Sequence, residues 1–140
     1  MKIKKGKFFI SPSDLNNFVA CKYTALNEIK CHNKEIKKNE DKANDKLWKE
    51  MGIEHEKKHF KILKDKYKKS ISIKSGLDEN DRFIETVRAI QKGYDLIYHA
   101  YLIDVNFRGE ADFLIKCDTP SDLGDYSYEV IDTKNSNKPK

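Results

Sequence analysis

The 140-residue sequence has few cysteines and prolines and no long apolar run. Its three cysteines, Cys21, Cys31 and Cys117, are odd in number and form no C-x-x-C pair. This argues against a disulfide framework and a self-contained zinc finger and favours free thiols. No stretch approaches the roughly 20 apolar residues of a membrane helix, and the lysine-rich start lacks the apolar core of a signal peptide. We therefore expect a cytoplasmic, globular protein with no membrane partner.

Charged residues are abundant and unevenly distributed. They make up 36% of the sequence against 38% hydrophobic residues, and this composition and length suit one compact domain over residues 1–140. Residues 1–75 contain 20 Lys or Arg against 10 Asp or Glu, whereas residues 76–140 contain 8 against 13. A basic half beside an acidic half indicates a protein that binds a polyanion with one surface and a cation with another. The alternative is a lysine-rich surface that only confers solubility.

The hydrophobic pattern changes from helix-like to strand-like after Gly93. Three helices are predicted before that glycine, and the middle one carries His55 on its apolar stripe. The fold class is therefore α/β, with N-terminal helices packed on a small, mostly antiparallel sheet.

The first helix is expected from about Asp14, with a Ser, Pro and Asp cluster at residues 11–14 forming its cap and first turn, and with Leu15, Phe18, Val19 and Ala25 or Leu26 on one face. The second helix is expected from about Lys46, where Leu47, Met51, His55, His59 and Ile62 recur beside Phe60, Leu63 and Tyr67. The third helix follows Gly76 and ends at Lys92 and Gly93. The strands are expected at 71–73, 96–105, 109–117 and 126–134, with a hairpin turn at 106–109.

The stretch His55-Glu56-x-x-His59 has the HExxH spacing of zinc proteases. Two histidines four residues apart on a helix can bind one zinc ion while the glutamate activates its water. Two lysines separate these histidines, however, and Ile62 and Asp65 replace the glycine and third histidine of the extended motif. A zinc protease is therefore the less favoured hypothesis, and a part-buried structural role is the simpler interpretation of His59.

Two carboxylates in the last predicted strands indicate a different cation site. Asp112 interrupts an apolar strand, and alternation places Asp132 and Lys134 on one face of the next strand. A divalent cation shared by Asp112 and Asp132 would compensate their charge, as in magnesium-dependent phosphodiester hydrolysis, and the lysine would offset developing charge. A helix imidazole would complete the ligand set and admit manganese. A plain ion pair between Asp132 and Lys134 is the alternative.

Three motifs occur in order along the chain: G-x-x-H-E at residues 52–56, G-x-x-D-F-L at 109–114 and Y-E-V-x-D-T-K at 128–134. A fourth, S-x-L-x-x-F-x-x-C, lies at residues 13–21. Together they resemble the RecB-like branch of the PD-(D/E)XK nuclease superfamily, and in particular an uncharacterised RecB-like family often joined to helicase or RNase H-like domains.

The resemblance implies a restriction-endonuclease-like core and a Mg²⁺ or Mn²⁺ site. It assigns catalytic roles to Asp112, Asp132 and Lys134. It also implies that the metal ligands are His55, Asp112, Asp132 and the Thr133 carbonyl. Glu56 would contact these ligands and not the metal itself.

The chain departs from the family pattern after Lys134 and in its cysteines. Residues 135–137 are Asn-Ser-Asn where an apolar and a basic residue are usual, and the sequence stops at Lys140 before the family's Q-x-x-x-Y helix. Cys21 matches the first of four cysteines that hold an iron-sulfur cluster in many relatives, so a cluster is expected only in a full-length form.

The sequence therefore predicts the N-terminal portion of a RecB-like nuclease. The expected function is metal-dependent cleavage of single- or double-stranded DNA in repair, recombination or defence. The expected partners are DNA and either a helicase or the missing C-terminal region. A non-catalytic nucleic-acid-binding fragment is the alternative from another functional class.

Overall fold

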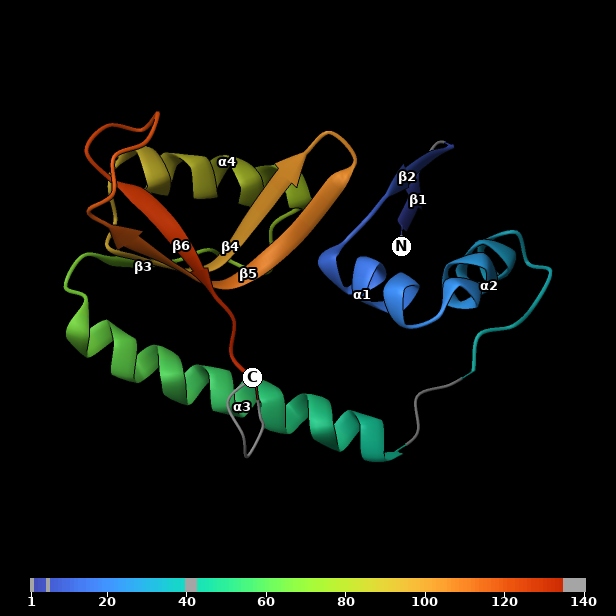
Figure 1. Cartoon of the computed structure of the whole chain (residues 1–140). Coiled ribbons are helices and arrows are strands. Elements are labelled where there is room, and N and C mark those ends of the chain that lie inside the picture. Colours follow the sequence, from blue (N-terminus) through green and yellow to red (C-terminus); the bar gives the residue numbers. More distant parts are fainter. Residues whose placement is uncertain (1, 5, 40–42, 135–140) are drawn as a thin grey trace. The chain divides into compact units, whose positions relative to one another are not determined.

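The computed structural model describes residues 2–4, 6–39 and 43–134 (Figure 1). These residues form four helices and six strands in two small sheets, a mixed α/β structure. The expected α/β class is confirmed at this level. No helix in the described ranges is both long and apolar enough to cross a membrane.

The chain divides into two compact units, which are described separately. One contains residues 1–41 and 103–109, and the other contains residues 42–102 and 110–140. The first unit holds an antiparallel pair of short strands followed by two helices. Its elements are β1 (Lys2–Lys4), β2 (Lys7–Phe9), α1 (Pro12–Ala20) and α2 (Lys22–His32).

Helix α1 begins with the predicted cap. The Ser11 side chain accepts a hydrogen bond from the Asp14 backbone N–H, and the Asp14 carboxylate accepts one from the Ser11 backbone N–H, which together form a capping box. The helix ends at Cys21, whose extended backbone (φ −158°, ψ 111°) also begins α2. The prediction that Ala25 or Leu26 continues the apolar face of the first helix is therefore wrong, because the break at Cys21 places both on α2.

The second unit is a sheet with one helix on each face. Helix α3 (Ala43–Lys66) and helix α4 (Glu79–Gln91) lie on opposite sides of it in Figure 1. The sheet has the order β3-β4-β5-β6, with β3 (Ser70–Ser72) parallel to β4 (Leu96–Asp104) and β5 (Phe107–Cys117) antiparallel to β6 (Ser127–Ile131). Only two residues, 105 and 106, join β4 to β5, and such a short connection requires antiparallel strands. The predicted mostly antiparallel sheet is confirmed.

Two boundaries differ from the sequence prediction. The turn between β4 and β5 falls at Val105 and Asn106 rather than at residues 106–109. Strand β6 ends at Ile131, so Asp132 and Lys134 follow the strand instead of belonging to it. The end of β6 can therefore turn these side chains in directions that strand alternation does not fix.

Each face of the sheet has its own apolar cluster. Small and branched residues pack under α4, whereas larger rings from the sheet meet α3 and the residue that follows it. The α4-side cluster contains Ile73, Ala89, Ile97, Ala100, Ala111 and Leu114. The α3-side cluster contains Leu96, Tyr98, Phe113 and Ile115, with Phe60, Leu63 and Tyr67 packed against it.

Most of the apolar stripe predicted for α3 does not face the sheet. Leu47, Met51 and Ile62 are 56%, 42% and 66% exposed. The row that packs contains Phe60 and Leu63 instead. Rings and branched chains at these positions bury more apolar surface against the sheet, so tertiary packing selects this row over the other.

Candidate functional site

The pairing of β5 with β6 brings two aspartates together. Phe113 lies opposite Ile131 in the antiparallel register, so one further step places Asp112 beside Asp132. The Thr133 backbone N–H and hydroxyl donate hydrogen bonds to Asp112 Oδ2 over 2.7 and 2.9 Å. The chain after β6 therefore folds back onto Asp112.

Asp132 and Lys134 form an ion pair at this position. Burial works against the Asp132 carboxylate, but its hydrogen bonds to Lys134 and Asp112 outweigh burial and lower its pKa. The hydrogen bond to Asp132 raises the pKa of Lys134 in turn. Both groups are therefore charged at neutral pH, and the lysine side chain remains 69% exposed to solvent.

Asp112 lacks comparable compensation. Burial and then the neighbouring Asp132 carboxylate raise the pKa of Asp112, although the two Thr133 hydrogen bonds act in the opposite direction. Two carboxylates in hydrogen-bonding reach of each other share one ammonium group. The pair therefore has the negative charge that a bound cation would balance.

A second polar network lies on the adjoining strands. Glu56 of α3 accepts a 2.6 Å hydrogen bond from His99 Nε2, and Glu110 Oε1 lies 3.7 Å from His99 Nδ1. Arg82 of α4 forms an ion pair with Glu110 and donates to the His99 carbonyl over 3.2 Å. These contacts connect both helices to β4 and β5.

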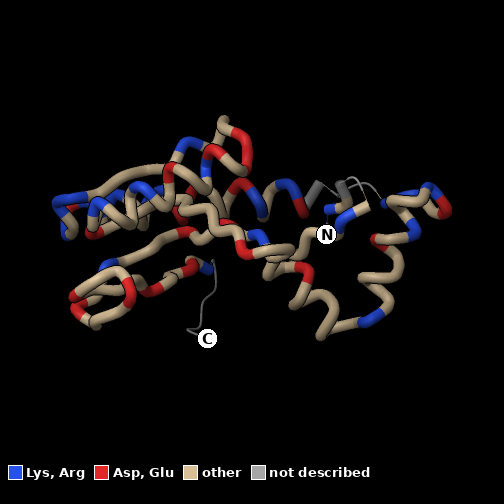
Figure 2. The backbone as a smooth tube through the Cα atoms, turned by 90° about the horizontal axis from the view of Figure 1, so that it is seen from above, with Lys and Arg blue, Asp and Glu red and all other residues tan. Residues whose placement is uncertain are grey.

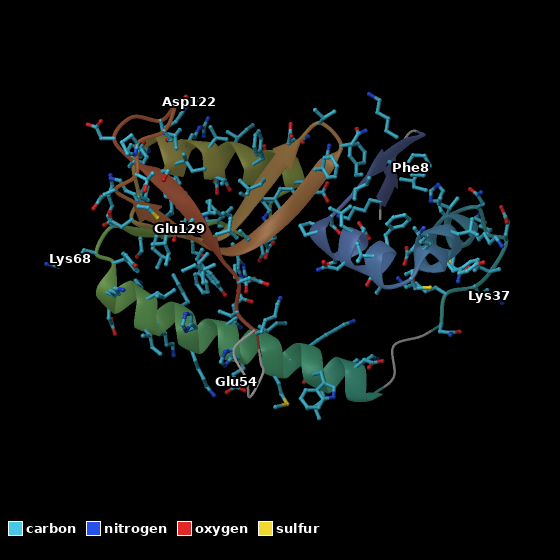
Figure 3. The ribbon with its side chains drawn as sticks, in the orientation of Figure 1. Phe8, Lys37, Glu54, Lys68, Asp122 and Glu129 are labelled. Carbon is cyan, nitrogen blue, oxygen red and sulfur yellow. The ribbon has the colours of Figure 1, made fainter. Side chains whose placement is uncertain are left out.

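Tyr98 links this network to the aspartates. Burial, a hydrogen bond to Glu56, and the negative charges of Asp112 and Glu110 all raise the pKa of the Tyr98 phenol. The phenol therefore lies close to carboxylates from α3 and from β5. Figure 3 shows that side chains of the sheet and of α3 fill the space between the sheet and this helix. We call Glu56, Glu110, Asp112 and Asp132 the acidic cluster.

A local irregularity in β4 orients the His99 side chain toward the acidic cluster. Ile97 and Ala100 belong to the α4-side core, whereas Tyr98 belongs to the α3-side core. Strict alternation would turn His99 toward α4, but its φ of 57° places the ring beside Glu56 on α3. The same alternation is interrupted in β5, where Ala111 packs on the α4 side and Phe113 on the α3 side. Asp112 lies between them.

The two histidines of HExxH have different environments. His55 is exposed, whereas Glu56, one residue further around the helix, contacts the sheet. The prediction that His55 lies on the packed stripe is therefore wrong, and α3 contributes Glu56 to the cluster. The His59 ring packs edge-on against Phe113 with centroids 5.7 Å apart, which confirms its part-buried structural role. Glu56 is hydrogen-bonded to His99, whereas the glutamate of a zinc protease activates a zinc-bound water, so the two geometries differ.

The donors differ in how well they fit a metal. Among the described residues, no group of three or more His, Cys, Asp or Glu side chains is arranged to hold an ion. Mg²⁺, however, commonly takes one or two protein carboxylates and fills its remaining positions with water and phosphate oxygens. Asp112 and Asp132 fit that pattern. Cys21, Cys31 and Cys117 are free thiols, and Cys21 is exposed.

Comparisons with protein-family models, with curated proteins and with solved structures find no match to this chain. Function is therefore inferred from the site itself. Sequence patterns had not identified Arg82, Tyr98 or His99 as members of the site. Only His99 left a usable signal, as a polar residue inside an apolar strand, of the kind that marked Asp112.

Proposed function

We propose that this chain hydrolyses DNA phosphodiester bonds with a divalent metal, as a RecB-like nuclease or a fragment of one. The supporting observation is the convergence of Asp112, in the middle of β5, with Asp132 and Lys134, which directly follow β6. A plain ion pair would need only the last two residues. It gives no reason for a partly buried third group, Asp112, whose pKa is raised by its neighbour.

The aspartates would hold Mg²⁺ or Mn²⁺ in this proposal. A cation bound there supplies polarisation of the scissile phosphate and lowers the pKa of a bound water. Thr133 orients Asp112 through two hydrogen bonds to one of its oxygens. The Lys134 ammonium beside Asp132 offsets negative charge that develops on the phosphate oxygens.

Helix α3 supports the site from one side. Glu56 holds His99 and is hydrogen-bonded to Tyr98, so it fixes two rings beside the aspartates. In this proposal Glu56 takes the place that sequence patterns gave to His55, and the Thr133 carbonyl remains a predicted ligand. Exposed lysines of α3, such as Lys57, Lys61 and Lys64, would contact phosphates without sequence preference. The two-sided sheet of this unit is compatible with a restriction-endonuclease-like core.

The decisive test is cleavage of labelled single- and double-stranded DNA with Mg²⁺, Mn²⁺ or EDTA. We expect activity only with a metal. Asp132→Asn and Lys134→Gln should each reduce the rate by at least about 10²-fold, because each removes charge at the reacting phosphate.

Matched controls come from exposed residues of the same types. Asp122→Asn and Lys68→Gln, both labelled in Figure 3, should leave the rate unchanged. His55→Ala should also retain activity, and its loss would restore His55 as a ligand. Cleavage that survives both Asp132→Asn and Lys134→Gln contradicts the proposed site.

A non-catalytic nucleic-acid-binding fragment is the second candidate. The surplus of lysine in residues 1–75 favours it. Salt-dependent DNA binding in EDTA, without cleavage under any metal condition, would support this function in place of hydrolysis.

A further inference from the structure

A groove lies beside α4 and β3, at the other edge of the sheet from β6. Its volume is about 400 Å³, and its lining includes Lys74, Arg88 and Lys92. Ile71, Ala89 and Tyr94 form its apolar part, and these residues also belong to or pack against the α4-side core. We call this the basic groove. The groove is thus attached to the face of the sheet opposite α3.

Cations dominate the lining of the basic groove. Glu85 is the one acidic side chain among its lining residues, which also include Ser72. Lys69 adds a further cation at the edge, because its ammonium donates to the Lys92 carbonyl and lies 5.2 Å from the centroid of the Tyr94 ring. Within the described residues, Lys74, Arg88 and Lys92 have no carboxylate partner. Their charge is therefore open to a ligand.

The end of α4 explains only part of this charge. Arg88 and Lys92 lie four residues apart in and after the last turn of that helix, where cations interact favourably with the helix dipole. Lys69 and Lys74 come from the segments on either side of β3, so no helix end accounts for them. Lysine and arginine residues are also spread over both units in Figure 2. What distinguishes the groove is that cations from separate elements surround a concave apolar surface.

We infer that the basic groove binds the sugar–phosphate backbone of a polynucleotide. Cations from three segments can meet successive phosphates, and the partly exposed Tyr94 ring offers a stacking surface for a base or sugar. The choice of ligand rests on the proposed function. The groove would hold a part of the nucleic acid that is not cut, since the sheet separates it from the acidic cluster.

The test measures binding of a fluorescein-labelled single-stranded oligonucleotide in EDTA by fluorescence anisotropy, at several salt concentrations. The groove variant is K74Q/R88Q/K92Q. We expect its affinity to fall at least about tenfold. We also expect the slope of log K against log salt to fall by about two, since each lost phosphate contact on single-stranded nucleic acid removes about 0.7.

The matched control is K7Q/K22Q/K37Q, which removes the same charge from exposed lysines of the first unit. It should lose much less affinity than the groove variant. Equal losses overturn the inference, because net charge alone would then explain binding. Absence of oligonucleotide binding by the wild type also overturns it. Thermal unfolding of each variant establishes that it is folded before binding is compared.

Two further arms separate the possible outcomes. A mononucleotide that competes as well as the oligonucleotide would mean a small-ligand site and would overturn the polynucleotide inference. Cleavage is measured in parallel with Mg²⁺. If the wild type binds the oligonucleotide through the groove but does not cleave DNA, the groove inference holds and the proposed nuclease function is contradicted. If the groove variant binds and cleaves as well as the wild type, the groove inference is contradicted and the nuclease proposal holds.

Discussion

The two faces of the four-stranded sheet are packed differently. On the α4 side, Thr86 and Ala89 are buried in the helix, with 0% and 2% exposure, above small residues of the sheet. On the α3 side, large rings such as Phe60 and Phe113 meet, and Glu56 lies just beyond them along the helix. The acidic cluster thus occupies the margin where apolar packing of α3 ends. A helix that packs along part of its length leaves such a margin, where charged groups can be partly buried and still reach solvent.

One residue connects the two faces. Arg82 belongs to α4 and is 8% exposed, yet its guanidinium reaches Glu110 and the His99 carbonyl. Its neighbour one turn later, Thr86, accepts a hydrogen bond from the Tyr101 N–H and donates to the Arg82 carbonyl. The polar groups under α4 are therefore held in fixed positions, and one of them, Arg82, contacts Glu110 of the acidic cluster.

The largest effect should follow from removing the ring at the centre of the α3 side. Phe113→Ala should lower the free energy of unfolding by about 3–5 kcal/mol, since Phe113 is fully buried and contacts Phe60, Tyr98 and His59. Urea unfolding in EDTA measures this change. Val130→Ala, on an exposed position of β6, is the control and should stay within about 0.5 kcal/mol of the wild type. Similar losses of unfolding free energy in Phe113→Ala and Val130→Ala would contradict the difference between the buried core and the exposed margin of the sheet.

A smaller effect should distinguish the neighbours His55 and Glu56. Glu56→Ala should cost about 1–3 kcal/mol, because the partly buried His99 loses its hydrogen-bond acceptor. His55→Ala should change the unfolding free energy by less than about 0.5 kcal/mol, since that side chain is exposed. The reverse ranking in the same urea experiment would mean that α3 presents the other face to the sheet.

The smallest effect should be a gain in stability from Asp112→Asn in EDTA. The folded-state pKa of Asp112 is raised, so the folded protein binds a proton there more tightly than the unfolded chain does. Above that pKa the charged wild type is penalised and the variant should be more stable, by at most about 1 kcal/mol because the carboxylate is partly solvated. The advantage should vanish as the pH falls through the folded-state pKa.

Thermal unfolding across pH measures this difference, with Asp122→Asn as the matched control. Added Mg²⁺ should raise the melting temperature of the wild type but not of Asp112→Asn. A variant that is less stable than the wild type at neutral pH in EDTA would show that Asp112 is already compensated without a cation.

Local sequence rules predicted most of the elements, although not helix α2 as a separate element or the strands β1 and β2. The Ser11 and Asp14 cap, the end of α4 at Lys92 and Gly93, and the strand pattern after Gly93 all depend on short-range chemistry, and the structure confirms them. The proximity of Asp112 and Asp132 was also predictable, because consecutive strands commonly pair in a sheet, and the structure pairs β5 with β6 in an antiparallel register.

The helix and strand partners of the site were not predictable in the same way. Helix α3 has two apolar rows, and only contact with the sheet determines that the row with Phe60 is buried. The position of His99 depends on the φ angle of a single residue, which periodicity does not encode. Sequence patterns therefore assigned the helix contribution to His55 instead of Glu56, and they missed the histidine of β4.

The left-handed backbone at His99 restricts which residues can replace it. Glycine adopts a φ of 57° most readily, asparagine, aspartate and histidine are the other residues most often found there, and β-branched residues are penalised. Among these residues, histidine alone has a ring whose two nitrogens can face Glu56 on one side and Glu110 on the other. The main chain and the side chain at this position therefore favour the same residue, and few substitutions would satisfy both.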